Sequence, residues 1–493
     1  MQFFRPLKLN TIKLTLVALV FLISAGMEDA YWNVPNADRT LLQRPNVLFI
    51  AVDDMNDWVG VLGDAQVITP NIDALADKGI TFTNAHCAAP VCNPSRVALM
   101  SGLRPSTTGV YNNGDNMNDL IPDSVIMLPQ YFRQNGYLVA GGGKLFHDVP
   151  THNYREENFD EYFWWNKDGA RGALLNGVWR SPYSVPPDPQ PDPRPSNNIT
   201  PITKRNFDWA ALDGNELNWP DGQVVAWAEE FLAKDHKRPF FLGVGIFRPH
   251  VPWFNPSKYV EMYPLDKIEV PEVKQDDLDD IGEFGQRLAL DKGSKHDKIM
   301  EFGEWEEAVQ AYLASISFAD ASLGRVLEAL DNSQYKDNTI IVFWSDHGYH
   351  LGEKQHWHKF TLWERSTRVP FIIVAPQVAT AGSKSSRPVS LLDIYPTLVQ
   401  LVGLPRNETL EGQDLMPLLK DPKAKWEYPA ITTHQKGNHA IRTENWRYIR
   451  YQTGEEELYD HAHDPNEWNN LSMDPGYKVI IDELRTWLPQ EKG

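Results

Sequence analysis

A short stretch of the chain, Val91 to Gly102, concentrates residue types that can do chemistry. It carries the pattern Cys-x-Pro-Ser-Arg as Cys92, Pro94, Ser95 and Arg96. Pro94 suits the first position of a helix, where a missing N–H costs no hydrogen bond. Cys92 is then expected just ahead of a helix N-terminus, where free backbone N–H groups and the helix dipole favour an anion. For a lone Cys-Pro pair, a buried cysteine beside a helix start would be the simpler interpretation.

Two predicted core strands end in side chains that can bind a metal. The strands are residues 46–52 and 339–344, both continuous apolar runs of the kind found in buried parallel strands. Open α/β sheets bind ligands beyond the carboxyl ends of their strands, so the residues that follow are candidates for a ligand site. An isolated Asp-Asp pair is more often a solvated turn. The residues in question are Asp53, Asp54, Asp346 and His347.

Four further cationic or titratable side chains lie in loops. Lys144 and His147 follow three glycines, which permit close approach of the backbone to a ligand. His250 follows a predicted strand at residues 240–247 and lies between two prolines that stiffen its loop. Lys359 ends a polar loop that begins after the second acidic motif. Individually, each would be read as a flexible turn or a structural side chain.

Together and in this order, the motifs resemble the type I, formylglycine-dependent sulfatases. The resemblance covers about residues 44–471. Within the family, the chain resembles the iduronate-2-sulfatase-like subgroup and exported bacterial polysaccharide sulfatases. In this family a maturation enzyme oxidises the cysteine to formylglycine, whose hydrated form is the nucleophile. The resemblance therefore implies a hydrolase of sulfate monoesters. It also implies an α/β fold of the alkaline-phosphatase type, with a large mixed sheet flanked by helices and a smaller C-terminal antiparallel sheet.

The resemblance also assigns roles to single residues. The lysines would bind the oxygens of the sulfate group, Arg96 would hold the diol, His250 would protonate the leaving alcohol and His147 would take a proton from the diol. The implied catalytic residues are Cys92, Arg96, Lys144, His147, His250 and Lys359. The implied Ca²⁺ ligands are Asp53, Asp54, the modified Cys92, Asp346 and His347.

Contacts to the substrate are predicted in the loops near these motifs. An Asn-rich loop follows the Cys92 helix, and the loop after Gly348, which departs from the iduronate-2-sulfatase pattern, is expected to face the substrate. An arginine can pair bidentately with the carboxylate of a uronic acid. We therefore expect a sulfated polysaccharide fragment, with a 2-O-sulfated uronic acid or a related sugar at its non-reducing end. Ulvan and glycosaminoglycan fragments both remain open as its source. The predicted contacts are Asn113, Tyr349, His356, Trp357 and Arg442.

The length and composition of the chain limit its partners, its disulfide content, its location and its domain organisation. The chain has 493 residues and a net charge of −19, which argues against a nucleic-acid partner. Two cysteines exclude a disulfide framework. Residues 1–26 have the basic, apolar and small-residue regions of a signal peptide, without a lipobox cysteine and without length for stable membrane insertion, so we expect a secreted or periplasmic protein. The expected domains are residues 44–405, catalytic, and residues 406–493, a small α+β unit.

Three alternatives remain open at this point. A phosphonate or phosphate ester hydrolase of the same superfamily would share most of the site, although such enzymes usually carry Thr or Ser at the nucleophile. A choline-sulfatase-like enzyme would act on a small molecule. A non-catalytic glycan-binding protein would not need the complete set of site residues.

Overall fold

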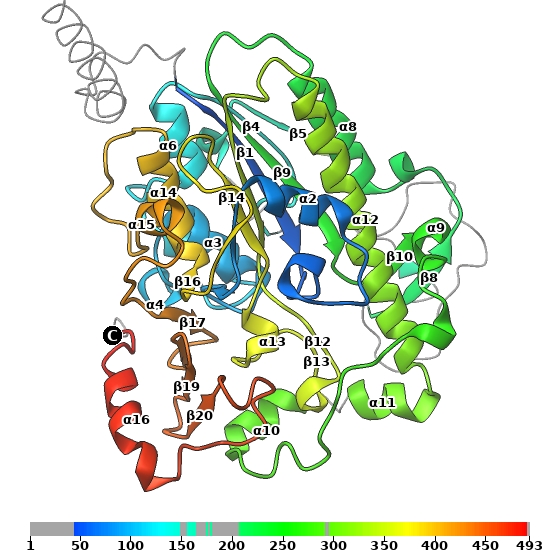
Figure 1. Cartoon of the computed structure of the whole chain (residues 1–493), viewed down its shortest axis with the longest axis vertical. Helices are drawn as coiled ribbons and strands as arrows, with labels where there is room; N and C mark the ends of the chain where they lie inside the picture. The colour runs from blue at the N-terminus through cyan, green and yellow to red at the C-terminus, as the bar shows by residue number, and fades with distance from the viewer. Residues whose placement is uncertain are drawn as a thin grey trace, which may run out of the picture.

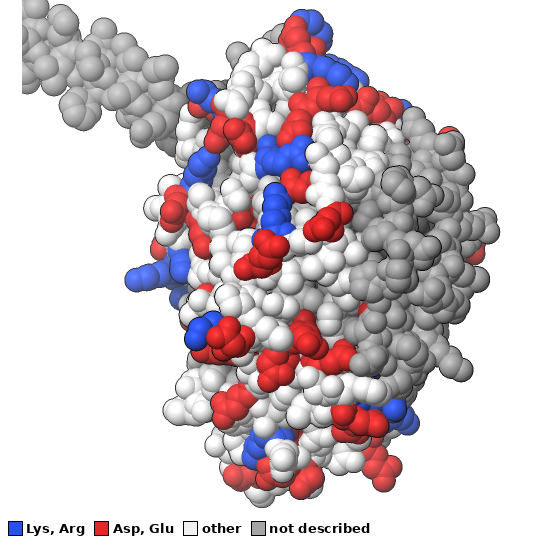
Figure 2. All heavy atoms as spheres, turned by 90° about the vertical axis from the view of Figure 1, so that its right-hand side faces the viewer, with Lys and Arg blue, Asp and Glu red and all other residues white. Residues whose placement is uncertain are grey.

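The computed structural model describes residues 44–147, 155–163, 174–175, 178–179, 207–290 and 295–490. The expected signal peptide and a Pro-rich segment, residues 181–195, lie outside the described residues. No helix in these ranges is both long enough and apolar enough to span a membrane. On the face shown in Figure 2, acidic and basic side chains are interspersed among uncharged ones.

An eight-stranded mixed sheet forms the centre of the molecule (Figure 1). Strand β1 (Asn46–Asp53) lies in its middle, parallel to β9 (Phe240–Pro249) on one side and to β11 (Thr339–Ser345) on the other. From one edge to the other, the remaining strands are β15 (Ser383–Ser385), β2 (Ile80–Phe82) and β14 (Phe371–Val374) before β11, then β4 (Leu138–Gly143) and β5 (Glu161–Phe163) after β9. This architecture confirms the expected fold class.

Helices cover both faces of the sheet. Alternate residues of β1 point to opposite faces and are buried under these helices. Leu48, Ile50 and Val52 belong to one hydrophobic cluster, and Val47 and Phe49 to the other. The first cluster packs against α2 (Pro70–Lys78), α8 (Pro220–Leu232) and α12 (Trp305–Asp331), on the right in Figure 1. The second packs against α3 (Cys92–Ser101), α6 (Leu128–Gln134), α14 (Ile394–Leu401) and α15 (Met416–Lys420), on the left.

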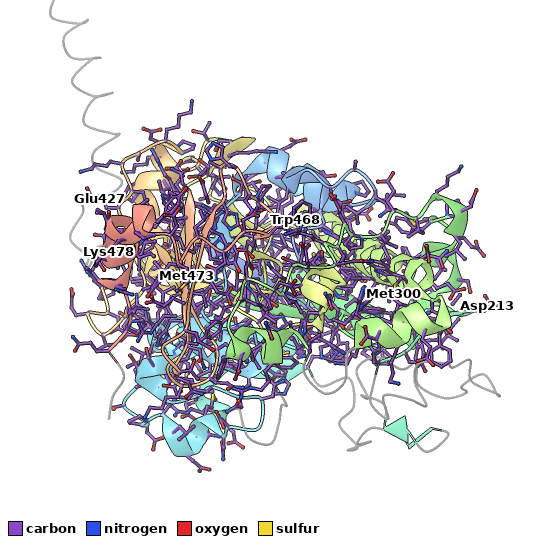
Figure 3. The ribbon with its side chains drawn as sticks, turned by 90° about the horizontal axis from the view of Figure 1, so that it is seen from below. Asp213, Met300, Glu427, Trp468, Met473 and Lys478 are labelled. Carbon is purple, nitrogen blue, oxygen red and sulfur yellow. The ribbon has the colours of Figure 1, made fainter. Side chains whose placement is uncertain are left out.

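The last part of the chain forms an antiparallel sheet with a terminal helix, as predicted. Its elements are β17 (Ala430–Thr433), β18 (His439–Arg442), β19 (Trp446–Arg450), β20 (Glu456–Asp460) and α16 (Lys478–Arg485). Seen from below, Lys478 and Met473 mark this end of the molecule, and Met300 and Asp213 mark the opposite end (Figure 3). Leu418 and Leu419 of α15 pack in the second cluster, so the chain completes that layer before it enters the small sheet. The boundary at residue 405 stays a prediction.

Shorter elements connect these layers. They are β3 (Ala85–His86), β6 (Leu174–Leu175), β7 (Val178–Trp179), β8 (Trp209–Leu212), β10 (Trp253–Pro256), β12 (His350–Leu351), β13 (Trp357–His358), β16 (Val389–Ser390), α4 (Pro105–Thr108), α5 (Met117–Leu120), α9 (Ser257–Val260), α10 (Glu283–Ala289), α11 (Lys295–Phe302) and α13 (Glu364–Thr367).

The structure corrects one boundary. Helix α3 begins at Cys92 itself, with Val91 as its N-cap, so Pro94 is the third helical residue and not the first. Proline is accepted there because the first turn of a helix has no intrahelical acceptors for its N–H groups. Cys92 therefore lies in the first turn and not ahead of it.

A glycine contact between β4 and β9 sets the position of Lys144. Gly143 has a φ of +72°, and a Cβ added to it would lie 2.0 Å from the carbonyl oxygen of Gly245 on the paired strand. The same carbonyl accepts a hydrogen bond of 3.0 Å from the backbone N–H of Lys144. The two strands can approach this closely only because neither residue has a side chain.

Gly143→Ala should therefore destabilise the protein by roughly 2–5 kcal/mol, combining the left-handed backbone with overpacking against a strand. Gly109→Ala is the matched control, because Gly109 has a φ of +78° and no atom within 4 Å of the added Cβ. The control should lose only about 1–2 kcal/mol, from the backbone conformation alone. Chemical denaturation of both variants measures the difference. Equal losses would contradict the contact as described.

Candidate active site

The carboxyl ends of β1 and β11 bring the predicted acidic side chains together. Asp53 is the last residue of β1 and Asp54 follows it, while Asp346 and His347 follow β11, the parallel neighbour of β1. The backbone N–H of Asp54 donates to Oδ1 of Asp346 over 3.1 Å, which joins the two strand ends directly. All four side chains are fully buried. Unpaired carboxylates at this depth would be strongly unfavourable, so cations must accompany them.

Helix α3 presents Cys92 to these carboxylates. Ser95 donates its hydroxyl proton to the carbonyl oxygen of Asp346 over 2.5 Å, which fixes the first turn of the helix against β11. The Arg96 guanidinium donates from Nε to Oδ2 of Asp346 over 2.8 Å, and its Nη2 lies 3.5 Å from Oδ1 of Asp53. Arg96 also donates to the carbonyl oxygen of Lys144, the residue that follows β4. This one buried cation therefore links three strand ends.

Two lysines approach Cys92 from different loops. Lys144 pairs with Asp53 and lies 3.9 Å from the Cys92 sulfur, and Lys359 pairs with Asp54 over 2.5 Å and lies 2.9 Å from the same sulfur. Burial would raise the pKa of Cys92, but the two ammonium groups lower it well below the usual range for a thiol. Burial would likewise raise the pKa of Asp53, and Lys144 lowers it. The site is thus built to hold negative charge at residue 92.

His347 completes a cluster that can hold a metal ion. Its Nδ1 donates to the carbonyl oxygen of Gly348 over 3.0 Å, which leaves Nε2 free to face Cys92 at 3.3 Å and Asp54 at 3.4 Å. Among the described residues, Asp53, Asp54, Cys92 and His347 each offer one ligand atom, and these atoms lie within 4.8 Å of one another. Oδ1 of Asp53 and Oδ2 of Asp54 accept no hydrogen bond from any described residue.

This donor set fits a divalent metal ion, because two carboxylates and an imidazole nitrogen surround the position that an oxygen at residue 92 would share. Asp346, the fifth predicted ligand, has both oxygens engaged by Arg96 and by the Asp54 N–H. Burial raises the pKa of Asp346 to about 7, although Arg96 and His347 oppose this shift. For His347, burial lowers the pKa, but Asp346 raises it to about 9 overall.

The two predicted proton-transfer histidines lie at the edge of this cluster. His250 donates from Nδ1 to the carbonyl oxygen of Val251 over 2.6 Å, and its Nε2 lies 3.9 Å from Oδ2 of Asp54. Its side chain is 18% exposed, whereas those of Asp54 and His347 are 0% exposed, so it can meet a group that arrives from solvent. His147 lies beside Cys92, and burial lowers its pKa although the Cys92 charge opposes this.

Four of the five predicted substrate contacts are engaged in interactions inside the protein. Tyr349 is fully buried, and its hydroxyl pairs with Nδ1 of His358 over 2.8 Å. His356 uses both ring nitrogens on the carbonyl oxygens of Ala289 and Lys359, at 2.7 Å each. These two side chains position the loop that carries Lys359 and have no polar atom left for a sugar.

The other two engaged residues pair with side chains of helices α11 and α13. Trp357 is buried and donates from Nε1 to Nδ1 of His296. Arg442 pairs with Glu364 over 3.0 Å, so its guanidinium joins the small sheet to α13 and already has a carboxylate partner within the protein. The fifth residue, Asn113, accepts a hydrogen bond of 3.0 Å from the backbone N–H of Asn93, next to Cys92. It positions the start of α3.

Sequence reasoning missed one residue that touches the site. Tyr312 of α12 donates its hydroxyl proton to the carbonyl oxygen of Asp54 over 2.7 Å. It lies three residues after Val309 and four before Ile316, on the buried face that the helical spacing predicts. A tyrosine on such a face needs a hydrogen-bond partner, and this requirement could have drawn attention to it.

Comparison with known proteins decides the family. A family model described as sulfatase matches residues 45–404, and a second model, N-sulphoglucosamine sulphohydrolase, C-terminal, matches residues 352–492. The chain belongs to the sulfatase family. It is therefore an enzyme that hydrolyses sulfate esters, as the resemblance implied.

Individual sulfatases are similar over most of the chain. A sulfatase of Formosa agariphila is 41% identical, with 91% of this chain and 87% of that protein covered. Human iduronate 2-sulfatase is 32% identical (73% and 69% covered), and an ulvan-active sulfatase of Formosa agariphila is 29% identical (90% and 80% covered). Among solved structures, a phosphonate monoester hydrolase of Agrobacterium radiobacter has the same fold, with a TM-score of 0.71 at 23% identity over 90% of this chain and 96% of that one.

The lysine pair leads to a prediction about the unmodified protein. Cys92 should be a thiolate at neutral pH, because Lys144 and Lys359 lower its pKa, whereas Cys87 should remain a thiol, because burial raises its pKa. Lys359→Met should raise the pKa of Cys92, since it removes the ammonium group 2.9 Å from the sulfur.

Ultraviolet thiolate absorbance against pH measures this, on protein made without a maturation enzyme and with Cys92→Ser as the blank. Wild type should keep a thiolate signal to lower pH than Lys359→Met. Superimposable titration curves would contradict the assigned electrostatics.

Proposed function

We propose that this sulfatase is an exported enzyme that removes sulfate from fragments of a sulfated polysaccharide, with formylglycine at position 92 and Ca²⁺ as its metal. The observation that carries this proposal is the convergence of two buried lysines and a carboxylate–histidine cluster on Cys92. The cysteine lies in the sequence pattern that sulfatase maturation recognises. The apolar N-terminal segment supports export, and polysaccharides are found outside the cell.

The chain's own residues account for sulfate binding. A sulfate monoester carries a full negative charge, and further charge develops on the leaving oxygen as the S–O bond breaks. Lys144 and Lys359, which reach residue 92 from two separate loops, would bind the sulfate oxygens that do not leave. Arg96 stays charged and holds the strand ends in place while the lysines turn from their carboxylates to the substrate. Hydrated formylglycine supplies a hydroxyl nucleophile, and a bound divalent ion supplies positive charge beside it.

Proton transfer is assigned to the two edge histidines. Because Nδ1 of His250 donates to the Val251 carbonyl, a protonated His250 presents its remaining N–H, at Nε2, to an alcohol leaving above Asp54. Burial lowers the pKa of His147, which favours its neutral form, and we assign it to accept a proton from residue 92. We thus assign the acid role to His250 and the base role to His147.

The relatives support a sugar substrate. Two of them carry names that state a saccharide, iduronate and ulvan, and both cover most of this chain. We infer a sulfated uronic acid or a related sugar at a chain end. Since four of the five predicted sugar contacts are committed to internal hydrogen bonds, this inference rests on the relatives and not on those side chains.

The first test combines mass spectrometry with turnover. Active protein should carry formylglycine at position 92, and it should release sulfate from an aryl sulfate and from sulfated uronate oligosaccharides. Cys92→Ala should abolish both reactions, because it removes the side chain that is converted to the nucleophile. A fully active protein with unmodified Cys92, or one that prefers an aryl phosphate or a phosphonate ester, would overturn the proposal.

His250→Ala tests the general acid. It should slow release of a sugar alcohol on the order of 10²–10⁴-fold and release of nitrophenolate far less, because a basic leaving oxygen needs the proton more. The measurement is kcat/KM for a sugar sulfate and an aryl sulfate. His463→Ala, which changes a histidine of the small subdomain that is 83% exposed, is the control and should leave both values unchanged. Equal losses on the two substrates would make His250 a positioning residue.

A further inference from the structure

Asp54 holds an unusual backbone conformation for a residue with a side chain. Its φ is +66°, in the left-handed region. Residues other than glycine pay a conformational cost there, on the order of 1–3 kcal/mol, and keep the conformation only when the surrounding structure enforces it. The turn that follows β1 directs the Asp54 carboxylate toward Lys359 and His347, so the conformation serves the site.

Four hydrogen bonds hold this turn from the outside. The Asp54 N–H donates to Asp346 Oδ1 over 3.1 Å, and the Met55 N–H donates to Ser345 Oγ over 3.0 Å. The Tyr312 hydroxyl makes the other two. It donates to the Asp54 carbonyl oxygen over 2.7 Å and accepts from the Asn56 N–H over 2.9 Å. A single hydroxyl thus bridges both ends of the turn.

The Tyr312 side chain is itself tightly fixed. It is fully buried on α12. Its ring packs edge-on against Trp58 and Trp253, with centroids 5.9 Å and 5.4 Å away, and stacks on Tyr349 at 5.5 Å. These aromatic contacts leave the hydroxyl only one position, which is the position the turn requires.

We propose that Tyr312 is a positioning residue of the active site, whose hydroxyl holds Asp54 in the left-handed turn and thereby sets the geometry of the metal-binding cluster. It touches neither the sulfate position nor residue 92, so it acts through Asp54. The proposal rests on the proposed function, because it takes the cluster of Asp53, Asp54, Cys92 and His347 as the metal site.

Tyr312→Phe tests the proposal by removing one oxygen atom and keeping the ring. The buried Asp54 carbonyl and Asn56 N–H then lose their shared partner, so the turn should relax. The matched control is Tyr137→Phe. Tyr137 is also fully buried, and its hydroxyl donates to the Pro45 carbonyl over 3.0 Å at the opposite, amino-terminal end of β1. Melting temperatures of both variants record the general cost of a lost buried hydrogen bond.

Two readouts separate positioning from a merely structural role. Calorimetric titration of chelator-treated protein with CaCl₂ should give a 10–100-fold weaker affinity for Tyr312→Phe and an unchanged affinity for Tyr137→Phe, the range typical when a group that orients metal ligands is removed. Hydrogen exchange in metal-free protein should speed up at least tenfold in the peptide that spans residues 53–56, in Tyr312→Phe alone. Wild-type affinity together with unchanged exchange in that peptide would overturn the proposal.

The exchange readout does not depend on metal binding or turnover, so it distinguishes failure of this proposal from failure of the proposed function. A wild type that binds no Ca²⁺ or hydrolyses no sulfate ester would contradict the latter only. If Tyr312→Phe does not fold, Ser345→Ala releases the same turn at the Met55 N–H. That variant should show the same faster exchange, and unchanged exchange in it would overturn the proposal equally.

Discussion

Negative charge buried at the ends of parallel strands is the constraint on which the rest of this structure depends. Asp53, Asp54 and Asp346 are fully buried and lie within one small region. Carboxylates in such a position repel one another and lose their hydration, so cations must stay within contact distance. Arg96, Lys144 and Lys359 provide them from a helix and two separate loops. Burying these charges lowers the stability of the fold. We therefore infer that the cluster is retained because it binds an anion and a metal.

Several features of the fold follow from the need to assemble these charges. The glycine contact between β4 and β9 lets the Lys144 backbone bond directly to the neighbouring strand. Helix α3 begins at residue 92, and the ammonium groups of Lys144 and Lys359 lie 3.9 Å and 2.9 Å from the Cys92 sulfur. The loop from Tyr349 to Lys359 closes on itself through His356 and His358, which fixes the ammonium group of Lys359.

The sequence predicted the parts of the site that depend on local pattern. Apolar runs that end in Asp53 and Asp346 indicated core strands, and parallel pairing then brought their ends together. It could not predict contacts between segments far apart in the chain. Trp357 and Arg442 were expected at the substrate, but their partners, His296 and Glu364, come from distant elements that spacing does not reveal. Tyr312 was missed for the same reason, since its partner lies 258 residues away.

Diffraction from crystals grown with CaCl₂, using the anomalous signal of calcium, tests the central claim most directly. The account predicts one strong peak at about 2.3–2.6 Å from oxygens of Asp53 and Asp54, beside His347 and residue 92. It also predicts that the ammonium groups of Lys144 and Lys359 move off those carboxylates toward the position of the sulfate. A calcium peak elsewhere, or lysine–aspartate pairs that persist with no ion between the strand ends, would contradict the account.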